Sequence, residues 1–138
     1  MNQNTNKEIN VILVDDNSVF RTTLKKFLQN EFQYKIIGEV SSGKEFFALP
    51  NIGLADVILM DLQMPEMDGY AITKRARVNY SHIPVIAITM HSEKAYLEEL
   101  ISVGFKGCVF KPDIYKNINK AIETTIKDNY YFPPDIKI

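Results

Sequence analysis

The chain has 138 residues, of which 46% are hydrophobic and 24% are charged, and its formal net charge at pH 7 is -1. This length allows one domain with a core that needs neither metal nor disulfide to hold it together. The balanced charge argues against a surface that binds nucleic acid directly, and no apolar run approaches the length of a membrane span.

The N-terminal segment, "MNQNTNKE" (1–8), is polar and lacks the apolar centre of a signal peptide, so we predict a disordered arm. The only cysteine, Cys108, can form no internal disulfide, and no cysteine or histidine cluster has the spacing of a zinc site. We therefore expect a cytoplasmic protein in a reducing compartment, with no membrane association.

Short apolar runs predict five strands, which recur at intervals of about twenty to thirty residues. Most are continuous rather than alternating, which is typical of parallel strands that are covered on both faces. The runs are "INVILV" (9–14), "KIIGEV" (35–40), "DVILM" (56–60), "PVIAIT" (84–89) and "GCVF" (107–110).

Helical patterns lie between these runs and after the last one. The first follows Asn17, a possible N-cap, and a weaker helix in "GKEFFALPN" is expected to stop at Pro50 and Asn51. The expected apolar faces are Phe20, Leu24, Phe27 and Leu28; Tyr70, Ile72, Ala76 and Val78; Tyr96, Leu97, Leu100 and Ile101; and Ile114, Ile118, Ala121, Ile122, Thr125 and Ile126. This alternation predicts an open, doubly wound α/β sheet over residues 9–129, followed by a tail or linker, "YYFPPDIKI" (130–138).

Polar residues follow the strands at the edge where a doubly wound sheet builds its site. Asp15 and Asp16 end the first strand, Asp61 the third, Thr89 the fourth and Lys111 the fifth. Three clustered carboxylates repel one another unless a cation is present, and an all-oxygen site of this kind suits Mg²⁺. Asp61 could then act as a nucleophile for a phosphoryl group, with Lys111 and Thr89 on the phosphoryl oxygens.

Each residue alone has a plainer interpretation. A single acidic residue at a strand end usually caps a helix or forms a turn, and the pair Asp15 and Asp16 could cap the following helix. Thr89 and Lys111 are of types that occur on most surfaces. The prediction therefore depends on their joint placement.

Four motifs, "VILVDDN", "VILMDLQMPEMDG", "AITMH" and "CVFKP", resemble those of the receiver domain of two-component response regulators. The resemblance covers residues 9–129. It implies a (βα)5 CheY-like, flavodoxin-like three-layer fold with a parallel sheet of strand order 2-1-3-4-5. It also implies that Asp61 accepts a phosphoryl group from a sensor histidine kinase, in a bacterial signalling protein that is no enzyme beyond its own phosphorylation and dephosphorylation.

The resemblance assigns further roles around this phosphoacceptor. Asp16 and Asp61 would bind Mg²⁺ directly together with the backbone carbonyl of Gln63, and Asp15 would act through water. In this family the bond that precedes the proline after the lysine, here Lys111–Pro112, is often cis.

The phosphoryl oxygens would be held by Thr89 and Lys111, and phosphorylation would draw Thr89 inward. The family often has an aromatic ring three residues before the lysine, where this chain has Cys108, so signalling would depend on Thr89 and its loop. The resemblance implies that the bulk of Met90 could slow entry to the phosphoryl site, and that His91 and Gln63 occupy the two positions that flank the acyl phosphate in the family and tune its lifetime.

The segments "TMHSEKAYLEELISVGFKG" and "YYFPPDI" are similar to the NarL-like subfamily. Those regulators usually continue into a LuxR-type helix-turn-helix domain, so the resemblance implies control of transcription, a possible homodimer on phosphorylation, and DNA contact only through a domain that is absent from this chain. We favour a receiver that is part of a longer transcription factor; a stand-alone receiver that acts through protein contacts is the alternative.

Two other functions remain to be distinguished. Haloacid-dehalogenase-like phosphatases also combine an aspartyl nucleophile, Mg²⁺, threonine and lysine, but they need a second acid two residues after the nucleophile, where this chain has Gln63. A flavodoxin-like domain that binds flavin mononucleotide would need a phosphate-binding loop after the first strand, and the carboxylates there would repel a phosphate.

Overall fold

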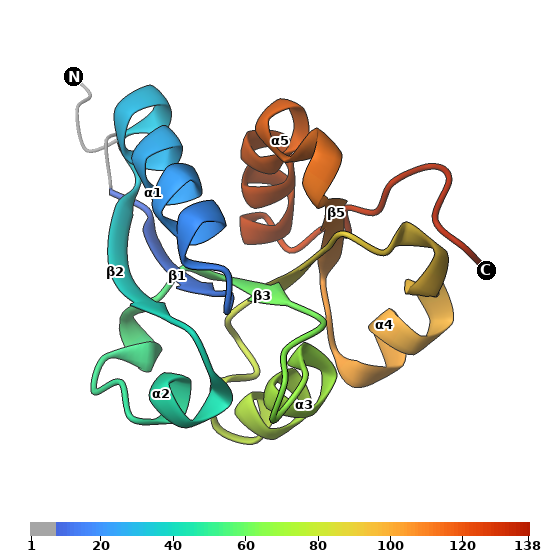
Figure 1. Ribbon diagram of the computed structural model, residues 1–138, viewed down its shortest axis with the longest axis horizontal. Helices are drawn as coiled ribbons and strands as arrows, with labels where there is room; N and C mark the ends of the chain where they lie inside the picture. The colour runs from blue at the N-terminus through green and yellow to red at the C-terminus, as the bar shows by residue number, and fades with distance from the viewer. Residues whose placement is uncertain (1–7) are drawn as a thin grey trace.

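Parallel strands form a five-stranded sheet of order β2-β1-β3-β4-β5 in the computed structural model, which describes residues 8–138 (Figure 1). The strands are β1 (Asn10–Val14), β2 (Lys35–Val40), β3 (Val57–Asp61), β4 (Val85–Thr89) and β5 (Gly107–Phe110). The predicted sheet and its strand order are confirmed. The predicted arm at residues 1–8 lies outside the described residues, apart from Glu8.

Helices cover both faces of the sheet, which gives the predicted three layers. They are α1 (Ser18–Phe32), α2 (Gly43–Phe47), α3 (Gly69–Tyr80), α4 (Leu97–Val103) and α5 (Ile114–Ile126). Helices α1 and α5 lie on one face, and α2, α3 and α4 lie on the other (Figure 1). Within residues 8–138 the structure contains no helix that is long and apolar enough to cross a membrane.

The strands are buried on both sides, which explains their continuous apolar sequences. Along β3, Ile58 and Met60 point into the core that α2, α3 and α4 cover, and Val57 and Leu59 point into the core under α1 and α5. Each fully buried aliphatic side chain of this size contributes about 1.5–3 kcal/mol. Asp61, the last residue of β3, therefore lies at the end of a strand that is buried along its whole length.

Side-chain caps set the start of the helices that follow β1 and β3. The Asn17 side chain accepts a hydrogen bond from the Phe20 N–H (3.0 Å) and begins α1 as predicted, and Asp68 does the same for α3 through Ala71 (3.0 Å). Helix α2 ends at Phe47, before the predicted stop at Pro50.

The predicted apolar face of α3 is wrong at one position, because Val78 is 80% exposed. Ile72 and Ala76 are four residues apart and share the buried face, whereas Val78 follows Ala76 by two and lies on the opposite side of the helix.

Candidate functional site

Three carboxylates meet where the sequence predicts them, at the carboxyl ends of β1 and β3. One carboxylate oxygen from each of Asp15, Asp16 and Asp61 lies within 4.8 Å of the other two. Asp15 and Asp61 are buried, with 1% and 3% of their surface exposed, while Asp16 is exposed. Such a set of oxygen ligands could hold a hard divalent cation, with the exposed side open to water.

Lys111 supplies the positive charge that faces these acids from the end of β5. Its Nζ lies 2.7 Å from Asp15 Oδ2 and 3.7 Å from Asp61 Oδ2, and it sits 4.4 Å from the centre of the Phe20 ring. A cation over an aromatic face is attracted by the ring electrons, so Phe20 helps to hold the ammonium in place.

The Lys111–Pro112 bond is trans, since residues 8–138 contain no cis peptide bond, so the family's frequent cis isomer does not occur here. Lys111 instead enters the site at the start of a short 3₁₀ helix, Lys111–Asp113. A proline early in such a helix costs no hydrogen bond.

The pKa of the Asp61 carboxyl is raised from 3.8 to about 7. Burial is the largest cause and the negative charge of Asp15 is the second, while Lys111 and a hydrogen bond from the Gln63 N–H (3.3 Å to Oδ1) oppose them. Without a metal, Asp61 therefore holds its proton up to about neutral pH. A bound divalent cation would favour its ionised form.

Thr89 lies at the end of β4 and is fully buried. Its hydroxyl donates to Gln63 Oε1 (2.7 Å) and accepts a hydrogen bond from the His91 N–H (2.9 Å). Thr89 is thus held between the loop that follows β3 and the loop that follows β4. Gln63 and Asp16 line one hollow beside the acids, and the Gln63 side chain is already engaged by Thr89.

Residues beside the site, which the motifs do not reveal, brace the end of β1. The Arg21 guanidinium donates to the Asp15 carbonyl and pairs with Glu39 (3.0 Å), and Lys25 also pairs with Glu39 (2.7 Å). The hydrogen bond from Lys25 is the largest cause of the lowered pKa of Glu39, and Arg21 adds to it. The i, i+4 spacing of Arg21 and Lys25 could have indicated a shared face of α1, although nothing in the sequence indicates Glu39 as their partner.

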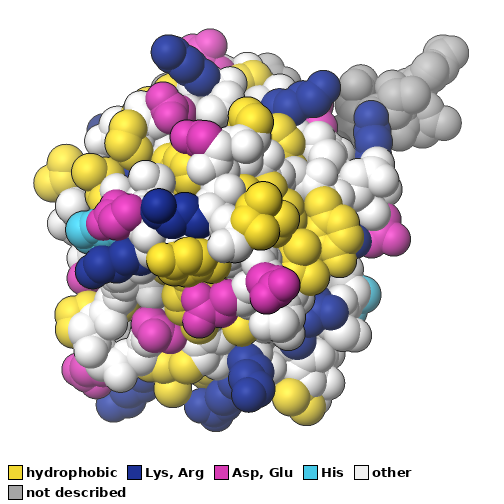
Figure 2. Space-filling view, turned by 90° about the vertical axis from the view of Figure 1, so that its right-hand side faces the viewer, with side chains coloured by type: hydrophobic (Ala, Val, Ile, Leu, Met, Phe, Trp, Pro, Cys, Tyr) yellow, Lys and Arg dark blue, Asp and Glu magenta, His cyan; other side chains and the backbone are white. Residues whose placement is uncertain are grey.

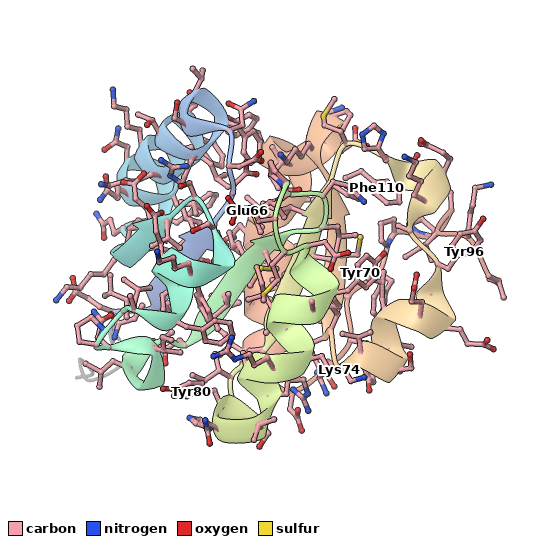
Figure 3. All side chains as sticks on the ribbon, turned by 60° about the horizontal axis from the view of Figure 1, so that its bottom comes forward. Glu66, Tyr70, Lys74, Tyr80, Tyr96 and Phe110 are labelled. Carbon is pink, nitrogen blue, oxygen red and sulfur yellow. The ribbon has the colours of Figure 1, made fainter. Side chains whose placement is uncertain are left out.

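Cys108 is fully buried in β5, and burial raises the pKa of its thiol to about 12. Tyr70 lies between α3 and α4 on the same side of the sheet, with its ring 5.9 Å from that of Phe105 (Figure 3). The Tyr70 hydroxyl is buried and has no hydrogen-bond partner within residues 8–138. Tyr70 thus packs, partly buried, against the same apolar cluster that contains Cys108.

Gly69, the first residue of α3, allows this helix to start directly against the site. A Cβ at this position would lie 2.2 Å from the Asp61 carbonyl oxygen and 2.9 Å from Met60 Cγ. The Gly69 N–H also donates to the Leu62 carbonyl (3.0 Å). The close contact therefore fixes how α3 approaches the end of β3.

We expect Gly69→Ala to lower the free energy of unfolding by about 1–3 kcal/mol, because the new methyl group must displace buried backbone. Urea unfolding would measure the loss. Gly53→Ala is the matched control, because its nearest atom, Tyr80 Cε1, would lie 3.8 Å away. Equal stability of both variants would contradict the steric argument.

An open parallel sheet of order 2-1-3-4-5, with acids, a threonine and a lysine at the carboxyl ends of its strands, defines the receiver class of α/β domains. A family model described as the response regulator receiver domain matches residues 11–123. The chain belongs to this family, and it is a receiver domain of the two-component response regulators, as the sequence predicted.

Similar proteins agree with this assignment. The chain is 35% identical over 126 residues to the transcriptional regulatory protein YdfI of Bacillus subtilis, covering 91% of this chain and 59% of that protein. It is 27% identical over 128 residues to the response regulator UvrY of Escherichia coli, covering 93% and 59%. The chain thus spans about three fifths of the length of these relatives.

Solved structures match the fold. A LuxR-family response regulator from Aurantimonas superposes with a TM-score of 0.84 at 23% identity, covering 94% of this chain and 93% of that one. The signal receiver domain of the putative response regulator NarL from Mycobacterium tuberculosis gives 0.78 at 27% identity, covering 88% and 98%. The CheY-like fold predicted from the sequence is confirmed.

Proposed function

We propose that Asp61 is the phosphoacceptor of this receiver domain and that a sensor histidine kinase is its donor. The observation that carries the proposal is the meeting of Asp61 with two further carboxylates and the Lys111 ammonium at one edge of the sheet. Phosphoryl transfer needs mainly positioning and charge neutralisation from a protein, and these groups supply both.

In the proposed reaction, a carboxylate oxygen of Asp61 attacks the phosphorus of the donor. An O–P bond forms as the bond between phosphorus and the donor's leaving group breaks, and the leaving group keeps that electron pair. Lys111 neutralises a phosphoryl oxygen, and Asp61 must first give up the proton that its raised pKa retains.

Mg²⁺ is the proposed metal, because three oxygen ligands with an open side fit a cation that keeps several waters. Asp16 and Asp61 would bind it directly with the Gln63 backbone carbonyl, and Asp15 through water. When bound, the ion would neutralise charge on the acids and on the phosphoryl group.

Thr89 would link the phosphoryl group to the rest of the domain. Its hydroxyl hydrogen now goes to Gln63 Oε1, and a phosphoryl oxygen on Asp61 would be a stronger, charged acceptor for it. We expect Thr89 to turn toward the phosphoryl group and to move the loop that follows it from Met90 onward.

The proposed output is transcription. Relatives that this chain resembles are named as transcriptional regulatory proteins and extend beyond the matched region. In this proposal residues 9–129 form the receiver unit of a cytoplasmic regulator, residues 130–138 begin a linker, and a LuxR-type domain outside this chain contacts DNA, with dimerisation on phosphorylation. A stand-alone receiver that acts through protein contacts would use the same site.

Incubation with Mg²⁺ and acetyl phosphate, followed by intact-protein mass measurement, tests the proposal. We expect one added phosphoryl group on the wild-type chain, located on Asp61 by peptide mapping, and none on Asp61→Asn or without Mg²⁺. Equal labelling of the variant would overturn the assignment. Sustained hydrolysis of a phosphate ester would instead favour a haloacid-dehalogenase-like phosphatase.

A further inference from the structure

The last ten residues lie against the domain rather than leaving it. We call this segment, residues 129–138, the strap. In Figure 1 it passes from α5 beside β5 and ends next to α4. The Tyr131 N–H donates to the Lys106 carbonyl (3.1 Å), and the Cys108 N–H donates to the Tyr131 carbonyl (2.9 Å). The strap thus adds a parallel bridge to the outer edge of β5.

The start of the strap fits this edge closely. Asp128, in the left-handed conformation with φ 67°, turns the chain after α5, and its carboxylate pairs with Lys106 (3.0 Å). The same Lys106 Nζ lies 4.3 Å from the centre of the Tyr130 ring. At Gly107 a Cβ would lie 2.8 Å from the Tyr131 carbonyl oxygen, so the glycine leaves room for the strap.

The far end of the strap holds the start of α4. The Leu97 N–H, the first of the helix, donates to the Lys137 carbonyl (2.8 Å), and within residues 8–138 the N-cap Tyr96 makes no side-chain cap. Ile136 is 9% exposed and belongs to the same apolar cluster as Ala95 and Cys108. The strap therefore supplies a carbonyl cap and an apolar side chain to this part of the fold.

The outer surface around α4 and the strap carries both apolar and charged side chains. Figure 2 shows the side that carries α4 and the strap, where apolar side chains lie among lysines and acids. Tyr96 and Tyr130 are 44% and 55% exposed, and Figure 3 places Tyr96 on the outer side, next to α4. The strap is held by its hydrogen bonds, by the buried Ile136 and by Tyr131 and Phe132, which are partly buried against the apolar clusters. It is less completely buried than the strands of the sheet, so it should open more easily than they do.

A short path connects Thr89 to the strap. The Thr89 hydroxyl accepts a hydrogen bond from the His91 N–H. A 3₁₀ turn at Ser92–Lys94 follows, and then the fully buried Ala95. Two residues later, the Leu97 N–H donates to the strap. A change in the direction of the Thr89 hydroxyl alters the anchor at the start of this loop. The hydrogen bond and the apolar contact at its other end require the loop in its present place.

We propose that the strap is a docked segment whose release is controlled through Thr89, and that a phosphoryl group on Asp61 undocks it from β5 and α4. This inference rests on the proposed function. The phosphoryl group would take the Thr89 hydroxyl from Gln63, the loop would shift, and the Leu97 bond to Lys137 would break. The strap would then be free in one state and docked in the other.

Amide hydrogen exchange on the whole chain tests this directly, because the Cys108 and Leu97 N–H groups both donate to strap carbonyls. With Mg²⁺ and beryllofluoride as a phosphoryl mimic, we expect both amides to exchange at least about tenfold faster, while amides inside β1 and β3 keep their rates. Ile136→Asp should give the same increase without the mimic. Ile138→Asp is the matched control, because Ile138 is 95% exposed.

The outcomes separate this inference from the function on which it rests. Absence of phosphoryl uptake from acetyl phosphate would overturn both. Phosphoryl uptake on Asp61 with unchanged or slower amide exchange at Cys108 and Leu97 would overturn only the proposal that the strap undocks. If Ile136→Asp loses protection throughout the sheet, the variant is unfolded, and the wild-type comparison with and without the mimic decides the question.

Discussion

Asp61→Asn is expected to raise the free energy of unfolding of the metal-free protein at pH 8 by about 2–4 kcal/mol. The native fold buries this carboxylate beside Asp15 and raises its pKa from 3.8 to about 7. Ionising Asp61 therefore requires more free energy in the folded state than in the unfolded chain. The uncharged amide of asparagine has nearly the same shape and avoids that cost.

The sign of the pH dependence follows from the direction of this shift. Between pH 4 and pH 7 the folded chain retains the Asp61 proton while the unfolded chain has lost it, so the Asp61 contribution to stability falls as the pH rises through this range. Above about pH 7 the contribution no longer changes, and below about pH 4 wild type and Asp61→Asn should converge. Urea unfolding across this pH range measures the difference between the two proteins, which isolates Asp61 from other carboxylates.

Bound Mg²⁺ should reverse the destabilisation that ionised Asp61 causes at high pH. Mg²⁺ at saturating concentration should stabilise the wild-type protein more at pH 8 than at pH 5.5, because the ion binds the ionised acids, and it should stabilise Asp61→Asn less. Asp113→Asn is the control, since Asp113 is exposed and outside the acidic cluster. A wild-type protein that is as stable as Asp61→Asn at pH 8 without metal would contradict the raised pKa.

The sheet and the acids were predictable because they depend on local patterns and one general rule. Continuous apolar runs mark strands that are covered on both faces, and parallel strands place their carboxyl ends at one edge. Asp15, Asp61, Thr89 and Lys111 follow from that rule without knowledge of any side-chain conformation. The convergence of these four residues at one edge of the sheet is therefore the part of the site that the sequence predicts most directly.

The contacts between side chains were not predictable in this way. The bond from Thr89 to Gln63 and the pairing of Arg21 with Glu39 depend on which rotamers two separate loops or elements present to each other. Val78 was misplaced because an apolar residue was taken as buried although its spacing from Ala76 turns it outward.

The position of the strap was likewise not predictable from the sequence. The two prolines in "YYFPPDIKI" correctly indicate a break in regular structure, but they say nothing of where the chain then lies. Its docking depends on the free edge of β5, on the missing side chain of Gly107 and on the start of α4, where Tyr96 makes no side-chain cap; helix α5 separates all of these from the strap in the sequence. Local composition therefore predicts the end of the helix but not the contact.

Lys111→Met is expected to slow phosphorylation by acetyl phosphate by about 10²–10³-fold, because it removes the one ammonium that faces both Asp15 and Asp61 from within 4 Å among the described residues. Methionine keeps the length and the contact with Phe20 but carries no charge. The rate is measured from the mass of the intact protein over time. Lys120→Met is the control, because Lys120 is exposed on α5.

The same variant separates the phosphoryl role of Lys111 from the metal site. Mg²⁺ and the Lys111 ammonium are both attracted to Asp15 and Asp61, so removing the ammonium should leave Mg²⁺ affinity equal or higher by calorimetric titration at pH 8. A fall in phosphorylation with intact Mg²⁺ binding would assign Lys111 to the phosphoryl oxygens. Loss of both in proportion would instead show that Lys111 mainly holds the acids in place, since two buried carboxylates without a counter-charge would then rearrange or protonate.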